Sequence, residues 1–362
     1  MFRDETLIGL GDGSTFPLPN MSGNRGGFRV QYVPGFVAPV RDPPAPDFEI
    51  VLQDLLSSNW TKRTNPKNFT LQGIAWGGGQ FVAVGVPDGT DAYLLTSPDG
   101  TAWTERANPK NFALNGIAWN GSIYAAVGQA DGTNSYIVTS ADGVTWTERN
   151  PTVSKNINLN DVVWNGSIFV AVGDGDGTDS YILTSPDGTT WTERNPTVAK
   201  NIALNGVTWG GSQFVAVGVA DGTDGYILTS PDGTTWTERA NSQNVSLESV
   251  AYSSSRGLYV AIGASAAGST YLITSPDAIT WSTRSTPTGD LFRDVLWSGA
   301  IFVAVGGTSN KNVITSRDGS NWSLKENIQP TPLTSVEWSG ARFVAVGAGD
   351  GAGAFIITSL NR

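Results

Sequence analysis

The stretch LNGVTWGGSQFVAVGVADGTDGYILTSPDGTTWTER, from Leu204 to Arg239, is the clearest copy of a unit that recurs seven times along the chain. A large aromatic residue ends the first predicted strand of each copy, at Trp76, Trp119, Trp164, Trp209, Tyr252, Trp297 and Trp338. A second tryptophan opens the last predicted strand, at Trp60, Trp103, Trp146, Trp191, Trp236, Trp281 and Trp322. Together these positions include all 13 tryptophans of the chain. A repeat of about 40–45 residues with several short strands is typical of a β-propeller.

Each unit contains four short predicted strands separated by turns. One example of each strand, in order, is Asn115–Trp119, Phe169–Gly173, Tyr181–Ser185 and Trp191–Arg194. The second strand is rich in Val, Phe and Ala, as expected of a strand buried on both faces. Gly-Gly-Ser, Asn-Gly-Ser and Pro-Asp-Gly supply the turns. The sequence therefore predicts an all-β protein, a seven-bladed β-propeller of four-stranded antiparallel blades with an extended N-terminal arm.

The two ends of the repeat array do not match. After Ser359 the last unit has no fourth strand, whereas an isolated fourth strand, Trp60–Arg63, precedes the first unit. We expect residues 60–63 to pair with the last blade, because this pairing removes the open edges of an incomplete array. The predicted propeller domain therefore spans residues 57–362.

Residues 1–56 share nothing with the repeat, and they form a predicted extended docking arm and Pro-rich linker. Alternation over Phe28, Val30 and Tyr32 indicates a strand that adds to a partner's sheet, and Phe36 and Val37 extend this apolar set. We expect residues 1–50 to dock the chain on other proteins of an assembly. The alternative is that the arm folds back on its own propeller.

The composition excludes several classes of site. The chain has no Cys and no His, which excludes disulfides, thiolate nucleophiles, Cys/His metal sites and histidine bases. A net charge of −10 disfavours nucleic acid. No apolar run reaches the ~20 residues that span a bilayer, and a standard secretory signal is not evident at the N-terminus. We expect no nucleic-acid partner, no membrane contact and no cofactor.

Six units carry the motif Ser-x-Asp-(Gly/Ala)-x-x-Trp between the third and fourth strands. The copies begin at Ser97, Ser140, Ser185, Ser230, Ser275 and Ser316. The motif resembles the Asp-box, or bacterial neuraminidase repeat, although it is one residue shorter than the usual form. The resemblance implies a propeller like those of phage structural proteins and bacterial surface proteins. Because Asp and Ser in tight turns accept backbone N–H bonds, a motif present in six blades indicates a structural role.

Two enzyme classes are alternatives to this structural interpretation. Sialidases carry the Asp-box, but most arginines here repeat in the fourth strand, which we expect at the outer edge of each blade, where they cannot converge on one ligand. Another glycosidase requires two carboxylates at one site. Asp161, Glu248, Asp294 and Glu337 break the repeat in or beside the first strand, where we expect solvated channel positions. We therefore predict no catalytic residue and no enzyme activity.

Polar loops gather on one face of the predicted ring. The candidate binding residues in these loops are Asp88, Asp91, Lys110, Asn111, Asp131, Lys155, Asp174, Asp179, Lys200, Asp221 and Asp224. Such loops on a rigid scaffold are common binding sites, and they suit a saccharide or a peptide. Oxygen-rich loops can also hold Ca²⁺, but hairpin-turn chemistry alone accounts for Asp-Gly, and we predict no metal.

These observations favour a non-enzymatic structural protein. We expect a virion appendage, made in the host cytoplasm and placed on a phage tail or head as a decoration, with the propeller presented to a host-surface glycan or protein or to a neighbouring subunit. A bacterial surface or scaffold propeller that binds a protein partner is the first alternative, with the cell surface as its location. A glycan hydrolase is the second.

Overall fold

The computed structural model describes residues 7–9, 15–17, 60–241, 243–264, 270–307, 311–325 and 331–359. The chain divides into two units, residues 1–45 and 46–362. In the first unit, β1 (Leu7–Gly9) and β2 (Thr15–Pro17) form an antiparallel pair. The predicted docking residues Phe28, Val30, Tyr32, Phe36 and Val37 lie outside the described residues, and so does most of the predicted arm.

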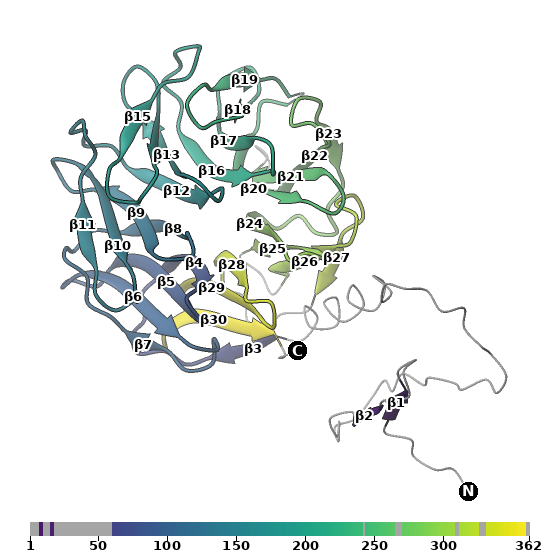
Figure 1. The fold of residues 1–362 in the computed structure, drawn as a ribbon. Coiled ribbons are helices and arrows are strands. Elements are labelled where there is room, and N and C mark those ends of the chain that lie inside the picture. Colours follow the sequence, from purple (N-terminus) through teal and green to yellow (C-terminus); the bar gives the residue numbers. More distant parts are fainter. Residues whose placement is uncertain are drawn as a thin grey trace, which may run out of the picture. The chain divides into compact units, whose positions relative to one another are not determined.

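The second unit is a ring of seven antiparallel sheets (Figure 1), each with four strands. Blade 1 contains β4 (Leu71–Gly77), β5 (Gln80–Pro87), β6 (Ala92–Ser97) and β7 (Thr104–Glu105). Blade 2 contains β8 (Leu114–Trp119), β9 (Tyr124–Ala130), β10 (Ser135–Ser140) and β11 (Thr147–Arg149). Blade 3 contains β12 (Leu159–Trp164), β13 (Phe169–Gly175), β14 (Ser180–Ser185) and β15 (Thr192–Arg194). Blade 4 contains β16 (Leu204–Trp209), β17 (Phe214–Ala220), β18 (Gly225–Ser230) and β19 (Thr237–Arg239).

The remaining blades follow the same order. Blade 5 contains β20 (Ser246–Ser253), β21 (Leu258–Ala264), β22 (Thr270–Ser275) and β23 (Ser282–Arg284). Blade 6 contains β24 (Phe292–Trp297), β25 (Phe302–Gly306), β26 (Val313–Ser316) and β27 (Ser323–Lys325). Blade 7 contains β28 (Leu333–Trp338), β29 (Phe343–Gly349), β30 (Ala354–Ser359) and β3 (Trp60–Arg63). The chain is thus an all-β, seven-bladed propeller, as the repeat predicts.

Blade 7 takes its outer strand from the start of the propeller sequence. Trp60 pairs with Ser359 and Arg63 pairs with Ile356 in antiparallel register. The Arg63 guanidinium also donates a hydrogen bond of 2.7 Å to the Thr358 hydroxyl. This strand completes the last sheet and closes the ring.

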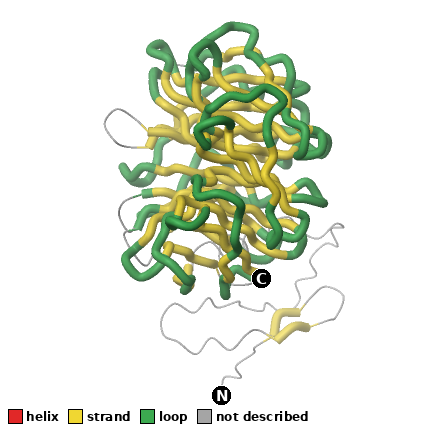
Figure 2. Tube along the Cα trace, turned by 90° about the vertical axis from the view of Figure 1, so that its left-hand side faces the viewer, coloured by secondary structure: helices red, strands yellow, loops and turns green. Residues whose placement is uncertain are grey.

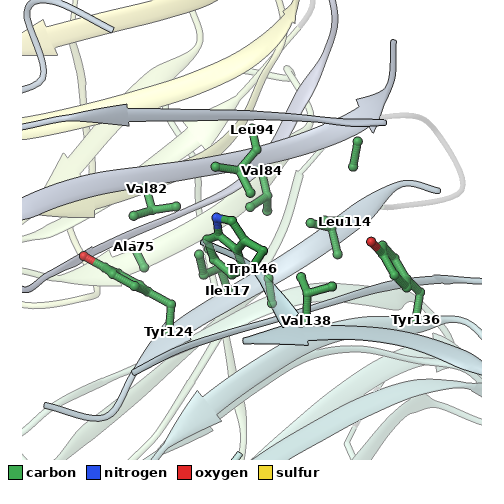
Figure 3. Close-up of a cluster of buried hydrophobic side chains, with 12 residues drawn as sticks. Ala75, Val82, Val84, Leu94, Leu114, Ile117, Tyr124, Tyr136, Val138 and Trp146 are labelled. Atoms are coloured by element: carbon green, nitrogen blue, oxygen red, sulfur yellow. The ribbon is translucent and has the colours of Figure 1, made fainter. Parts of the chain in front are cut away.

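The hydrophobic core lies between neighbouring blades. In one cluster, Val82 and Val84 of blade 1 pack with Tyr124, Val138 and Trp146 of blade 2 (Figure 3). The second and third strands of each blade are buried on both faces, which explains the apolar run Phe-Val-Ala-Val in the second strand. Seen from its edge, the ring has loops on both sides of the strands (Figure 2). Among the described residues, no helix is long and apolar enough to cross a membrane.

The Ser-x-Asp motif forms the turn before the outer strand in blades 1–6. In blade 3 the Ser185 hydroxyl accepts the Gly188 N–H at 2.8 Å and donates to Asp187 at 3.1 Å. The Asp187 carboxylate accepts the Thr189 N–H at 2.8 Å, and the Trp191 indole donates to the Gly188 carbonyl at 2.9 Å. The motif thus organises its own turn and fixes the tryptophan against the core, which is a structural role.

Candidate binding site at the channel mouth

The first strands of the seven blades surround a central channel. Each of them begins with a one-residue irregularity: in blade 1, Leu71 pairs with Gly85 and Gly73 pairs with Val84, so that Gln72 has no partner of its own. Such a bulge redirects side chains locally. It brings Gln72 and Gly73, together with their equivalents in the other blades, to the wall of a cavity of about 220 Å³.

One residue from each blade forms the mouth of this cavity. The mouth ring consists of Gln72, Asn115, Asn160, Asn205, Glu248, Arg293 and Thr334. Each residue follows the buried Leu or Phe near the start of its first strand. First strands begin where the connecting loops from the preceding blades arrive, so the mouth opens on the same face as the polar loops.

Blades 2–4 contribute three asparagines that bond to the next blade. The side-chain N–H groups of Asn115, Asn160 and Asn205 donate to the carbonyls of the leucines at 159, 204 and 247, at 2.8, 2.9 and 2.8 Å. Because a carbonyl only accepts, the amide nitrogen must face it. The amide oxygens therefore remain as acceptors at the mouth, with no donor among the described residues.

Blades 5–7 contribute different chemistry to the same ring. The Thr334 hydroxyl donates to the Leu71 carbonyl at 2.6 Å, which continues the bonding between blades. The side chains of Glu248 and Arg293 form no hydrogen bond or ion pair with any other described residue, and Arg293 is exposed. The mouth thus presents one unpaired carboxylate and one unpaired guanidinium.

Three more carboxyl groups line the channel below the mouth. Asp161 accepts the backbone N–H groups of Val162 at 2.8 Å and Val207 at 2.9 Å. Asp294 accepts the Ser249 hydroxyl at 2.8 Å and the Val336 N–H at 2.9 Å. The bonds from Val207, Ser249 and Val336 connect the inner strands of adjacent blades.

The channel carboxyl groups are shifted toward their neutral forms. Burial raises the pKa of Asp161 to about 7, and the charge of Asp294 adds to the effect. Burial likewise raises the pKa of Glu337 to about 8, against the hydrogen bond from the Trp338 N–H. Burial also raises the pKa of Asp294. Of the described residues that line the cavity, only Arg293 is basic. The four carboxylates that break the repeat, Glu248 included, thus share one cavity.

The predicted loop residues of blades 1–4 form a different arrangement, which we call the lysine clusters. In each cluster a lysine ammonium lies between the aspartate of one loop and the glutamate of the outer strand. The clusters are Lys67–Asp88–Glu105, Lys110–Asp131–Glu148, Lys155–Asp176–Glu193 and Lys200–Asp221–Glu238. In the fourth, both N–O distances are 2.5 Å. Sequence reasoning missed Asp176, although it aligns with Asp131 and Asp221 in the Asp-Gly-Thr frame.

The other predicted loop residues also have mostly internal partners. Asp91 and Asp224 each accept a backbone N–H at 3.1 Å, and Asn111 accepts the Gly89 N–H at 3.2 Å. Asp179 is buried, and its Oδ1 has no hydrogen-bond partner among the described residues. Asp174 accepts the Asn160 amide at 3.0 Å, so it is the predicted residue that contacts the mouth ring.

One acidic group in the described part of the chain has a spacing compatible with a metal ion. Oxygens of Asp221, Asp224 and Glu238 lie within 4.8 Å of one another. The Lys200 ammonium bonds to two of these residues, and together with the Asp224 N–H it lowers the pKa of Asp221 to about 2, despite burial. A metal ion would have to displace this lysine.

Comparison with known proteins supports the fold. A family model described as the DUF6242 beta propeller domain matches residues 150–295, less than half of the chain. No curated protein matches the sequence. Among solved structures, YCF48 bound to D1 peptide is similar with a TM-score of 0.63 and 17% identity, over 84% of this chain and 96% of that one.

Two further solved structures are similar to the same extent. YCF48 from Cyanidioschyzon merolae has a TM-score of 0.60 and 15% identity, with 83% of this chain and 98% of that one covered. The WD40 beta propeller domain of Doa1 has a TM-score of 0.60 and 14% identity, with 84% and 98% covered. At these identities the likeness concerns the fold alone. The matching family model and the similar structures thus support the propeller architecture that the Asp-box resemblance implies.

Proposed function

We propose that this propeller is a protein-binding scaffold that holds a peptide segment of its partner at the channel mouth. The observation that carries the proposal is the unpaired state of Glu248 and Arg293, next to the free amide oxygens of Asn115, Asn160 and Asn205. Peptide backbones present both donors and acceptors, so a ring that offers both is complementary to them. A similar propeller, YCF48, has been solved bound to a peptide.

The bonding of the polar loops favours the mouth, and not the loops, as the binding site. Their lysines, aspartates and glutamates are already bonded to one another. A ligand bound there would have to break these ion pairs, whereas the mouth charges have no such bonds to lose. We therefore assign the eleven predicted loop residues a mainly structural role, with Asp174 as the exception that positions Asn160.

We further propose that the protein is not an enzyme. A glycosidase needs two carboxylates free to take part in the reaction. Here the carboxylates of Asp161 and Asp294 accept backbone N–H groups of the next blade. The virion role rests on the structural repeat, the lack of an evident secretory signal and the N-terminal arm, and it stays a separate prediction about how the scaffold is attached.

A peptide selection tests the proposed site. The full chain is used to select binders from a random dodecapeptide display library, and the selected peptides are measured by fluorescence anisotropy. We expect the double variant Glu248→Gln/Arg293→Met to bind them at least about tenfold more weakly, since charge-assisted hydrogen bonds are lost. Arg256→Met is the matched control, because Arg256 is an exposed arginine in the turn beyond the other end of β20. Equal binding by the double variant would exclude the mouth.

A further inference from the structure

The channel acids differ from the carboxylates of the lysine clusters, which are the other carboxylate groups on this face among the described residues. In each lysine cluster, an ammonium group from the chain lies between the aspartate and the glutamate. Below the mouth, Asp161, Asp294 and Glu337 line one cavity, and its one basic residue among those described, Arg293, belongs to the mouth ring and forms no ion pair with them. Here no described lysine or arginine forms an ion pair with the carboxyl groups, unlike in each of the four clusters.

The free polar groups that line the cavity are mostly acceptors. Internal donors bond to the channel carboxyl groups, but a carboxylate has about four lone-pair positions, so capacity remains. The amide oxygens of Asn115, Asn160 and Asn205 and the Glu248 carboxylate add acceptors at the mouth. A ligand that fits this lining is rich in N–H donors and positively charged.

The arrangement of the carboxyl groups favours an organic cation over a metal ion. A calcium or magnesium ion needs several oxygens converging on one point. Within the described residues, the oxygens of the three channel acids do not form such a group. A lysine or arginine side chain has a long stem and several donors, so it reaches acceptors spread along a channel.

From these observations we infer that the partner segment inserts a lysine or arginine side chain through the mouth ring into the channel. The inference rests on the proposed function, because the side chain belongs to the peptide held at the mouth. The inserted cation reaches the carboxyl groups of Asp161, Asp294 and Glu337. Arg293, at the rim, is itself positively charged and does not pair with a second basic residue. It donates instead to a carbonyl or carboxylate of the same segment.

The pKa shifts of the channel acids are consistent with a missing cation. The pKa values of Asp161 and Glu337 lie at about 7 and about 8 because burial is not offset by a positive charge. An inserted ammonium or guanidinium group lowers the pKa of a neighbouring carboxyl group. Its binding therefore releases protons from the channel near neutral pH.

The test uses synthetic dodecapeptide pools that differ at one central position. This position is lysine, arginine, norleucine or glutamate, and the other positions are random but contain no basic residue. Binding of each pool to the full chain is measured by fluorescence anisotropy. We expect the lysine or arginine pool to bind at least about tenfold more tightly than the norleucine pool.

Channel variants then locate the basic side chain. Asp161→Asn/Glu337→Gln removes the charges and leaves one oxygen acceptor at each position, so one of the two backbone bonds to Asp161 is lost. This variant should abolish the preference over norleucine. Glu337→Gln alone serves as the milder variant if the double variant does not fold, as judged by circular dichroism, and it should reduce the preference. An unchanged preference in folded channel variants would overturn the inference.

The remaining outcomes separate the inference from the proposed function. If all pools bind equally and Glu248→Gln/Arg293→Met weakens all of them, the mouth binds peptides but no basic side chain enters the channel, and the inference fails alone. If neither these pools nor the selected peptides bind the full chain, the proposed function fails with it.

Discussion

Blades 1–4 and blades 5–7 share one backbone plan but satisfy their polar groups differently. Each of blades 1–4 has a lysine cluster, and blades 2–4 add an asparagine to the mouth ring. Blades 5–7 place Glu248, Arg293 and Thr334 at the mouth and add Asp294 and Glu337 to the channel. The regular blades thus use their charges internally, and the divergent blades leave two of theirs unpaired. The comparison locates the candidate function where the repeat breaks.

Removal of the strand that joins the two groups of blades should reduce the stability of the protein more than any other change. Deletion of residues 1–63 takes β3 from blade 7 and should destabilise the ring by at least about 3–5 kcal/mol, the usual cost of losing a buried Trp. It also exposes the edge of β30, which favours aggregation. Thermal melting and size-exclusion chromatography measure both effects. Deletion of residues 1–45 is the control, and equal melting of the two truncated proteins would disprove the closing role.

The channel acids should lower the free energy of unfolding as pH rises, whereas the lysine clusters of the loops should raise it. The pKa values of Asp161 and Glu337 are raised in the fold, so the unfolded chain ionises first as pH increases. The free energy of unfolding should therefore fall between about pH 4 and 8, by up to roughly 1.4 kcal/mol per pH unit and group. Denaturant unfolding across this range measures the slope. Asp161→Asn/Glu337→Gln should flatten it, and a wild-type stability that rises with pH would contradict the prediction.

Two equivalent turn positions, one in each group of blades, should respond oppositely to substitution because both have positive φ. Gly188 in blade 3 has φ of 73°, and a Cβ there would lie 2.7 Å from Ile123 Cδ1. Gly188→Ala should thus destabilise the protein by about 1–3 kcal/mol. Blade 5 has Ala278 at the equivalent position, with φ of 59°. Ala278→Gly should stabilise by about 0–1 kcal/mol. Chemical denaturation measures both changes, and equal losses from the two substitutions would show that strain is not the cause.

Substitution of a lysine in a cluster should change the stability least among these tests. Lys200→Met leaves the largely buried Asp221 without its cation and should cost about 1–2 kcal/mol. Lys62→Met in blade 7 removes a single ion pair with Asp350 and should cost less. Because Lys200 holds the pKa of Asp221 near 2, its contribution is present above about pH 4 and is lost as pH falls toward 2. Urea unfolding at pH 7 and pH 3 measures this; equal losses at both pH values would refute the assignment.

The repeat made the fold predictable, because each unit shows the same strands and turns and the incomplete ends indicate the closure. The lysine clusters also left a signal that the sequence reasoning did not use. Each lysine lies 21 residues before its aspartate and 38 before its glutamate in all four blades. Constant separations of this kind indicate partners rather than a free binding face.

The mouth ring could not be predicted in the same way. Glu248 and Asp294 stood out because they break the repeat, but alternation along a regular strand does not place consecutive residues on one wall. The bulge at the start of each first strand brings two consecutive residues to the channel wall. It arises from the pairing of the first strand with the second strand, which lies beyond the turn. Whether Glu248 and Arg293 bond to each other was also beyond the sequence, since they belong to different blades.

The pairing of β3 with β30 also has a consequence for the order of folding. Arg63 and Thr358 bond across a separation of 295 residues, so this contact forms only after nearly the whole propeller has been synthesised. Six blades take all four strands from one continuous segment and can assemble as they emerge from the ribosome. The seventh cannot, and the entropy of closing so long a loop makes it a slow step. During translation β3 therefore remains an unpaired strand, and this is the interval in which a chaperone has most to protect.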